Sequence, residues 1–525
     1  MKKRIIWLSL ALVVGQASHA YAQGASDALR YSQLQFGGPA RTQGIGGANV
    51  ALGADFGNLT NNPAGLGLFQ KSEVSFTPGI GIGQSDARID GSGTSGAQNS
   101  TKNSFHIGSA GLVLANRRPD SDQGTNWRGG AFAVGFTRLA DFNSSSNYQG
   151  SIGNNQSYLS RLQPQAGVRN QAFYDNLDGQ ATSGTYTTNL GLAYGAYLAN
   201  ISAYRGGNRA DSAVVLRKQG SVLRQGELIT NSGSMSQFDL GYGASYRDRL
   251  YIGGAVGIVS SNYTQVRTLT EADDDPNTHF NSLTSRTELQ TKGTGFNARL
   301  GLIYRALDNV RLGASVQTPT FMRLSDTFSE NLTANYSATG TDRVPRDLPV
   351  GNSPTVAFPT NDYAYALTTP FRANGGVAVT LGKHGFVTSD VEYVGYGQAR
   401  LHNDSQNAKG DDYSFTSENN DIQNRYQSTV NLRVGAEGRF DVFRVRLGYA
   451  RYGDPYKADT NNERVQNFYT GGLGLRQGNF FLDAAAVYTT MNQLYSPYTL
   501  DNGLQPLIKV NNTRFTTSVT AGLTF

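Results

Sequence analysis

The chain has 525 residues, among them 63 Gly and 28 Tyr but no Cys, and only 16% of its residues are charged. The lack of Cys excludes disulfides, thiolate metal sites and a Cys nucleophile, and the scattered formal charge of +6 offers no basic stripe for nucleic acid. Beyond the N-terminus no stretch approaches the roughly 18 apolar residues of a membrane-spanning helix, which excludes a helical membrane protein.

The N-terminus has the three parts of a secretory signal peptide. Lys2 to Arg4 form a positive region, residues 5–14 form an apolar region, and residues 20–22 have the A-x-A form of a cleavage site. We therefore expect residues 1–22 to be removed and Gln23 to begin the mature chain. No Cys follows the apolar region, which excludes processing as a lipoprotein.

Residues 23–70 precede the first predicted strand and are rich in Gly, Ala and Asn, with little alternation. The segment is too small to fold alone, so we expect it to pack as a hatch, or plug, inside the structure that follows. Pro63 restricts Asn62 to an extended conformation, and the Asn62 side chain can bond to nearby backbone. Asn62, Pro63, Ala64 and Gly65 therefore predict a fixed tight turn, although an ordinary loop turn has the same composition.

From about residue 71 onward apolar and polar residues alternate, which puts them on opposite faces of strands. In the last segment Phe515 and Leu523 share one face, and Thr516 and Ser518 share the other. A soluble β-sandwich alternates too, but its polar face is outermost. One face for lipid and one for water instead favours an all-β fold, a transmembrane antiparallel β-barrel over residues 71–525.

We predict about 14 strands, an even number as single-chain bacterial barrels require. They cover residues 72–83, 104–115, 128–141, 236–246, 250–266, 284–305, 309–330, 363–381, 386–401, 428–438, 442–453, 465–476, 480–491 and 512–525. Tight turns such as 247–249 alternate with long polar loops such as 338–362. Short turns belong on the periplasmic side of such barrels and long loops on the outside.

Two further features concern the surroundings of the barrel. Phe525 ends the chain on the lipid face of the last strand, so we expect it to close the barrel and to serve as the C-terminal signal for the barrel assembly machinery. Outer-membrane lipid and lipopolysaccharide would surround the protein, which we expect to be a monomer.

Residues 142–235 form an unusually long predicted external loop. It contains an apolar run whose helical spacing places five side chains on one face: Leu190, Ala193, Tyr194, Tyr197 and Leu198. We expect an amphipathic helix that covers the mouth of the barrel with an apolar surface, where a substrate could be captured.

The third predicted strand contains Gly129, Gly130 and Gly135. Glycine inside a strand marks a bulge or a bend, so this strand is the candidate for a kink. The other interpretation is that these glycines make room for packing in the lumen.

Alternation also turns Arg299, Arg433 and Arg446 toward the lumen. A carboxylate ligand would favour such a partner, because charge-assisted hydrogen bonds are strong where water is excluded. Opposite charges on neighbouring strands can instead form ladders that brace the barrel.

Several short motifs resemble the FadL/TodX family of outer-membrane transporters for long-chain fatty acids and aromatic hydrocarbons. They are Gly44 to Gly53 and Asn61 to Leu66 before the first strand, with Gly295 to Asn297, Asp390 to Val394 and Arg433 to Glu437 in later strands. The resemblance implies a fourteen-stranded barrel plugged by a hatch, in the bacterial outer membrane. It also implies passive uptake of hydrophobic small molecules, captured at external loops and released sideways beside a kinked strand, without cofactor or metal.

Two other functions remain open at this stage. A general diffusion porin for hydrophilic solutes would have the same alternation, but a plug of nearly fifty residues opposes open diffusion. An outer-membrane lipid hydrolase would need a nucleophile beside a His base. The mature chain offers His106, His279, His384 and His402, none of them near a G-x-S-x-G sequence, so we name no catalytic residue.

Overall fold

The computed structural model describes residues 24–90, 96–119, 121, 124–161, 171–203, 209–215, 222–341, 349–404, 413–457, 464–500 and 503–525. The predicted signal peptide lies outside these ranges and stays a prediction. Among the described residues, no helix is both long and apolar enough to cross a membrane.

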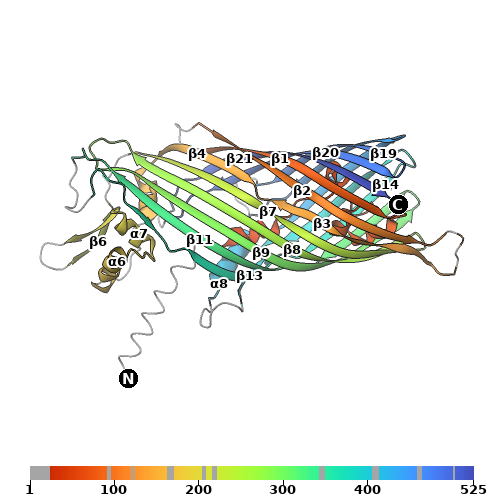
Figure 1. Ribbon diagram of the computed structural model, residues 1–525, viewed down its shortest axis with the longest axis horizontal. Coiled ribbons are helices and arrows are strands. Elements are labelled where there is room, and N and C mark those ends of the chain that lie inside the picture. The colour runs from red at the N-terminus through yellow and green to blue at the C-terminus, as the bar shows by residue number, and fades with distance from the viewer. Residues whose placement is uncertain are drawn as a thin grey trace, which may run out of the picture.

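Antiparallel strands form one long closed sheet, as predicted (Figure 1). The first strand, β1, pairs with β2 on one side and with the last strand, β21, on the other, and this pairing closes the barrel. Fourteen strands form the wall in the part of the chain that the structure describes. Ten are continuous: β1 (Glu73–Ile89), β2 (Gln98–Arg117), β7 (Leu223–Tyr246), β8 (Leu250–Asp273), β9 (Phe280–Leu307), β17 (Ser428–Phe440), β18 (Phe443–Tyr452), β19 (Gln466–Gln477), β20 (Phe480–Tyr495) and β21 (Ile508–Thr524).

The other four wall strands are interrupted. Each consists of two elements in line: β3 (Trp127–Asp141) with β4 (Ser144–Ile152), β10 (Val310–Gln317) with β11 (Phe321–Tyr336), β13 (Asn361–Thr368) with β14 (Arg372–Thr380), and β15 (Gly385–Gly395) with β16 (Arg400–Asn403). Pro319 and Pro370 lie in two of the gaps, where the missing proline N–H cannot join a ladder.

The wall is apolar outside and polar inside. Leu300 is 66% exposed, whereas its neighbour Arg299, which points inward, is 3% exposed. The same contrast recurs along the wall, with exposed Phe, Leu, Ile and Val outside and buried Asp, Glu, Arg and Thr inside. This is the reverse of a soluble protein and fits strands that face lipid.

The strands begin and end at the short turns close to where alternation predicts, but they run further at the opposite end. The turn 247–249 separates β7 from β8 as expected, whereas β7 starts at Leu223 rather than 236 and β8 ends at Asp273 rather than 266. In these extensions burial still alternates, but the buried face carries Gln225, Glu227 and Glu271 beside Leu223 and Leu269, so polar and apolar residues no longer alternate. The predicted loop 142–235 is accordingly too long, because β4 and the start of β7 occupy its two ends.

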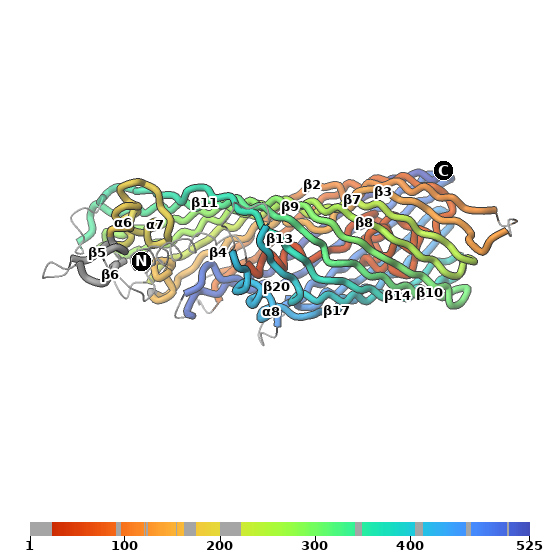
Figure 2. Tube along the Cα trace, turned by 90° about the horizontal axis from the view of Figure 1, so that it is seen from below, coloured from red at the N-terminus to blue at the C-terminus, as the bar shows by residue number. Residues whose placement is uncertain are grey.

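The N-terminal segment lies within the barrel, where Figure 2 draws it in red between the walls. It contains α2 (Ala25–Ser32), α3 (Ala40–Gly44), α4 (Asn58–Asn61) and the 3₁₀ helix η1 (Pro63–Leu68). Helix α3 contacts β18 to β21, and η1 contacts β3, β7, β8 and β9 on the opposite wall. The segment therefore reaches across the lumen.

The remaining elements belong to the long loops. They are η2 (Asn154–Gln156), α5 (Tyr158–Arg161), α6 (Gln171–Ser183), α7 (Asn189–Gly195), β5 (Ala199–Ala203), β6 (Arg209–Val215), β12 (Thr355–Ala357), η3 (Tyr396–Gln398) and α8 (Thr416–Arg425). Most of them gather at one end of the barrel, opposite the C-terminus (Figure 1).

Candidate functional site

The predicted hatch turn is rigid. Asn62 is extended, with φ −144° and ψ 96°, and Pro63 begins η1. The Asn62 side chain accepts a bond from Ala64 N at 3.2 Å and donates to Val50 O at 2.7 Å and to Leu302 O in β9 at 3.1 Å. One buried amide therefore fixes the turn and ties it to the barrel wall.

Glycines in the wall let this turn approach closely. A Cβ at Gly253 would lie 2.3 Å from the carbonyl oxygen of Pro63, and a Cβ at Gly301 would lie 1.8 Å from Oδ1 of Asn62. Any larger residue would push the hatch away from β8 and β9. The abundance of Gly in these strands thus has a packing cause.

The three predicted lumen arginines all have carboxylate partners. Arg299 pairs with Asp239, Arg433 with Glu392 at 2.6 Å, and Arg446 with Glu437 and Asp483, each at 2.7 Å. All these side chains are buried. The geometry matches ladders of charges that brace the barrel. A ligand would have to compete with a carboxylate for each of the three arginines.

The apolar run in the long loop is mostly hidden. Helix α7 ends at Gly195, and Tyr197 follows with a φ of 62°, so the chain turns before the predicted helix is complete. Leu190, Ala193 and Leu198 are buried in a cluster of loop and strand-end side chains. The expected apolar capture surface is therefore reduced to Tyr197, which is 40% exposed, and the half-buried Tyr194.

The wall breaks between β2 and β3. The two strands pair from Arg117 and Gly129 up to Ser109 and Thr137, where their ladder ends. Just beyond, at Leu139, the register of β3 against its other neighbour, β7, shifts. Within the described residues, the rest of β2, Gln98 to Gly108, pairs only with β1. A free strand edge of this length is unusual in a closed barrel, because closure normally removes edges.

The three predicted kink glycines lie before this break rather than at it. Gly135 is paired on both sides, and a Cβ there would lie 2.6 Å from the ring of Phe56 in the hatch. Gly130 faces the Tyr242 ring, and Gly129, with a φ of 126°, forms a separate irregularity near the start of β3. The strand is interrupted as expected, but its glycines serve packing.

Beyond the break, the edge of the wall formed by β4 lies inside the edge formed by β2. Strand β4 contacts both β1 and β2 but pairs only with β7. Its side chains Tyr148 and Ile152 pack on Ala87 and Ile89, which point inward from β1. The two edges therefore overlap, with β2 outside and β4 inside. Outside, Phe105 is 75% exposed beside the break.

The hatch covers the break from within. Gln35 N donates to the carbonyl oxygen of Leu139 at 2.9 Å, so the hatch backbone bonds to β3 where β2 no longer does. Gly37 sits directly against the backbone of Arg138, since a Cβ there would lie 2.2 Å from its carbonyl oxygen. Phe142, just beyond, meets Tyr31 of α2 edge to face at 6.0 Å.

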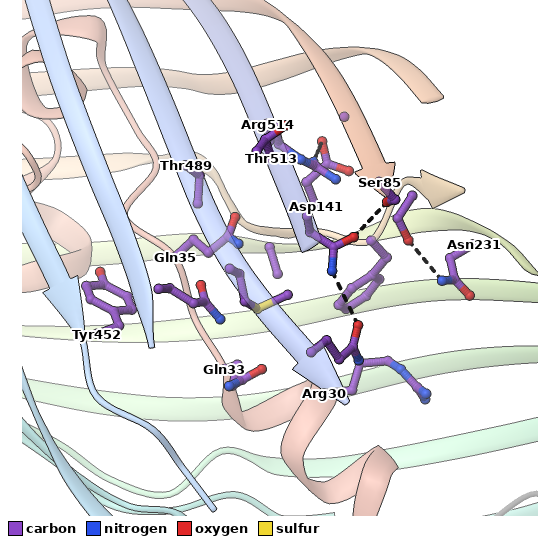
Figure 3. A pocket seen from close by; sticks show the side chains of 18 of the residues that line it. Arg30, Gln33, Gln35, Ser85, Asp141, Asn231, Tyr452, Thr489, Thr513 and Arg514 are labelled. Carbon is purple, nitrogen blue, oxygen red and sulfur yellow. Dashed lines mark hydrogen bonds and ion pairs between the residues drawn. The ribbon is translucent and has the colours of Figure 1, made fainter. Parts of the chain in front are cut away.

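A cavity of about 320 Å³, which we call the chamber, lies between the hatch, at Arg30 and Gln33 to Gln35, and the inner face of the barrel wall. Figure 3 shows Gln35, Asp141, Thr489 and Arg514 among the side chains around it. Residues with amide side chains are frequent in the lining: Gln33, Gln35, Asn231, Gln265, Gln466 and Gln493. Leu34, Phe142 and Met491 add apolar surface, so the chamber can hold a ligand with both polar and apolar parts.

A second cavity of about 70 Å³ lies beside the chamber, at the break. Gln35, Asp141 and Arg514 line both cavities. The second cavity also borders His106 and Gly108 on the unpaired edge of β2. The structure thus brings together a polar chamber, a small cavity beside it and a gap in the strand pairing.

Arg30 carries positive charge to the chamber wall. Its guanidinium is bonded to Asp27 within α2 and lies 4.0 Å from the ring centre of Tyr263. Burial raises the pKa of Asp27 above its ordinary value, and the Arg30 charge opposes this shift. The pair fixes the end of α2 beside the chamber.

The residues at the break were not among those predicted from the sequence. Asp141, Arg514, Ser104 and the hatch residue Gln35 come from segments far apart in the chain, and none belongs to a recognisable motif. One local signal was available: Leu139 and Ala140 are adjacent and both buried, which interrupts the period of two.

No protein-family model matches the chain, and no curated protein matches it by sequence. Among solved structures, a FadL homologue from Pseudomonas aeruginosa aligns over 93% of this chain and 99% of its own length, with a TM-score of 0.52 and 11% identity. The toluene transporter TodX of P. putida covers the same shares with a TM-score of 0.48 and 13% identity, and the Ralstonia pickettii toluene transporter TbuX does so with 0.46 and 15%. Identities this low establish only a common fold. The chain therefore has the fold of the FadL-type outer-membrane barrels, as its motifs indicated.

Proposed function

We propose that this protein is a passive outer-membrane transporter of hydrophobic small molecules, which leave the barrel sideways through the break between β2 and β3. The position of the second cavity, which shares lining residues with the chamber and borders the break, supports this most directly. A ligand entering from the long-loop end would meet the hatch below it and the break beside it. The exposed apolar side chains Ile80, Phe105 and Ile107 around the break suit release into lipid.

The lining of the chamber favours a ligand with a polar end. Gln33, Gln466 and Thr489 can bond to oxygen atoms, which a plain hydrocarbon lacks. Burying these groups against a hydrocarbon would leave them without partners, at a cost of about 1–3 kcal/mol each. Between the two ligand classes that the resemblance implies, we therefore favour fatty acids over aromatic hydrocarbons.

A covalent staple across the break tests the route. The chain has no Cys, so paired Cys substitutions are unambiguous. Ser104 Oγ and Asp141 Oδ2 are 3.0 Å apart across the break, so Ser104→Cys with Asp141→Cys should cross-link under oxidation. We expect the cross-link to abolish uptake of a labelled fatty acid by cells, and a reductant to restore it.

The matched control is Ser109→Cys with Thr137→Cys. These residues are direct partners in the intact part of the same two strands, so their cross-link adds nothing to a ladder that is already closed. Uptake should be the same before and after oxidation. Full uptake through a completely cross-linked Ser104 and Asp141 pair would exclude release at the break.

A further inference from the structure

Asp141 joins three strands at the point where the wall breaks. Its Oδ2 accepts a hydrogen bond from Ser104 Oγ at 3.0 Å, and Ser104 lies on the unpaired edge of β2. The same oxygen lies 2.7 Å from Nη1 of Arg514 in β21. One carboxylate at the end of β3 therefore connects both sides of the break.

The other carboxylate oxygen fixes the turn that leads into β4. Asp141 Oδ1 accepts bonds from the backbone N and the side-chain Nδ2 of Asn143, both at 2.8 Å, and lies 3.2 Å from Arg138 Nη2. Arg514 in turn donates to the carbonyl oxygen of Asn143. Moving β4 away from β2 would thus separate Asp141 from Ser104 and Arg514, and Arg514 from Asn143.

These contacts are effective because they are shielded. The side chain of Asp141 is 12% exposed and that of Arg514 is 20% exposed. Charge-assisted hydrogen bonds are stronger in such surroundings than in water. A continuous ladder would add two backbone bonds for every two residues, whereas here side chains supply the connection across the break. The break can therefore open with few backbone bonds lost.

We propose that Asp141, with Arg514 and Ser104, is a latch that keeps the overlap of β2 and β4 closed and sets how often it opens. This proposal rests on the proposed function, because the opening that the latch controls would serve lateral release. Asp141 acts here by positioning the two edges, and it needs no bond to the ligand. Opening separates its carboxylate from Ser104 and Arg514, after which the second cavity reaches the lipid.

The variant Asp141→Asn tests the latch while preserving size. An amide oxygen can still accept from Ser104, but the attraction to Arg514 is lost. Spin labels at Asn103 on β2 and Gln149 on β4, both exposed, would report the distance between the two edges. We expect a longer and broader distance distribution in Asp141→Asn, and an initial uptake rate higher by roughly twofold to tenfold, as the loss of one partly shielded pair allows.

The control is Lys509→Gln. Lys509 also lies on β21 and forms an ion pair at 2.9 Å with Asp90, but this pair spans β21 and the end of β1, whose ladder is continuous there, and does not bond to β2, β3 or β4. Its loss should leave the label distances unchanged. Exchange of the two charges, Asp141→Arg with Arg514→Asp, should restore a narrow distribution.

The distance measurement is independent of transport. Unchanged distances in a folded Asp141→Asn barrel would overturn the latch even if uptake is normal. A broadened distribution supports the latch, and if no ligand is then taken up by any form, the proposed function fails and the latch stands. Should Asp141→Asn not fold, Arg514→Gln removes the same pair from the other strand and is read in the same way.

Discussion

Two seams of the same barrel differ in how they are held. β1 and β21 pair along their lengths, from Glu73 opposite Thr524 to Ile89 opposite Ile508. β2 and β3 start in the same way but stop pairing after Ser109 and Thr137. A ladder with many bonds closes the first seam, whereas hatch backbone and side chains cover the second. The release route that we propose follows the weaker seam, because the second cavity borders the edge that β2 leaves unpaired.

Deletion of the hatch should have the largest effect on this comparison. A barrel of about 14 strands is too wide for its own side chains to fill, so removal of residues 24–70 should turn a nearly non-conducting protein into an open pore. Both seams keep their strand pairing, since the hatch contributes no strand to the ladder. Single-channel conductance in planar bilayers measures this. High conductance of the intact protein, unchanged by the deletion, would favour the porin instead.

Removal of Phe525 should disable the stronger seam. Phe525 N donates to Ser72 O at 3.0 Å and Ser72 N donates to Phe525 O at 3.1 Å, so these two bonds end the closing ladder. We expect the truncated chain to lose the heat-modifiable band of a folded barrel on gels. Phe105→Ala, which removes an exposed aromatic from the free edge of β2, should assemble normally. Equal assembly of both variants would contradict the role of Phe525.

The hatch also packs against the paired part of the weaker seam. A Cβ at Gly111 in β2 would lie 2.0 Å from the Phe56 ring, so Gly111→Ala should displace Phe56 at a cost of roughly 1–3 kcal/mol. Thermal unfolding of Gly111→Ala, Phe56→Ala and the double variant forms a cycle. We expect the double variant to be less destabilised than the sum of the single ones. Additive losses would mean that the two sites are not in contact.

The strands could be predicted from the sequence because the alternation of apolar and polar residues indicates which face of a strand meets lipid and which meets the lumen. It put Arg299 inside and Leu300 outside, and the structure agrees. Alternation weakens where the buried face also carries polar side chains such as Gln225 and Glu227, and for that reason the long-loop end of β7 was missed. Strand pairing is harder to predict from the sequence. A residue such as Ser104 can stand on a strand edge that is paired or on one that is not.

The candidate site was less accessible to prediction for the same reason. The glycines of β3 are a visible feature, yet Gly135 makes room for Phe56 and the break follows at Leu139. The lumen arginines are also visible, but each is occupied by a carboxylate. Asp141 and Arg514 meet only because β3 and β21 are brought together by the closure of the barrel, a contact that spans most of the chain.

The smallest expected effect concerns the selectivity of the chamber for its ligand. Thr489→Val and Gln466→Leu remove hydrogen-bonding groups from the chamber at nearly constant volume. Each should weaken binding of a long-chain fatty acid by roughly twofold to tenfold, the equivalent of one hydrogen bond, while leaving a hydrocarbon of equal length unaffected or bound more tightly. Thr517→Val, on the exposed face of β21, is the control and should change neither affinity. Equilibrium binding to purified protein separates this question from the route, because a ligand can occupy the chamber whether or not the break opens. Equal affinity for both ligands in the natural chain would mean that the polar lining does not distinguish fatty acids from hydrocarbons. The proposed substrate class would then be hydrophobic molecules in general.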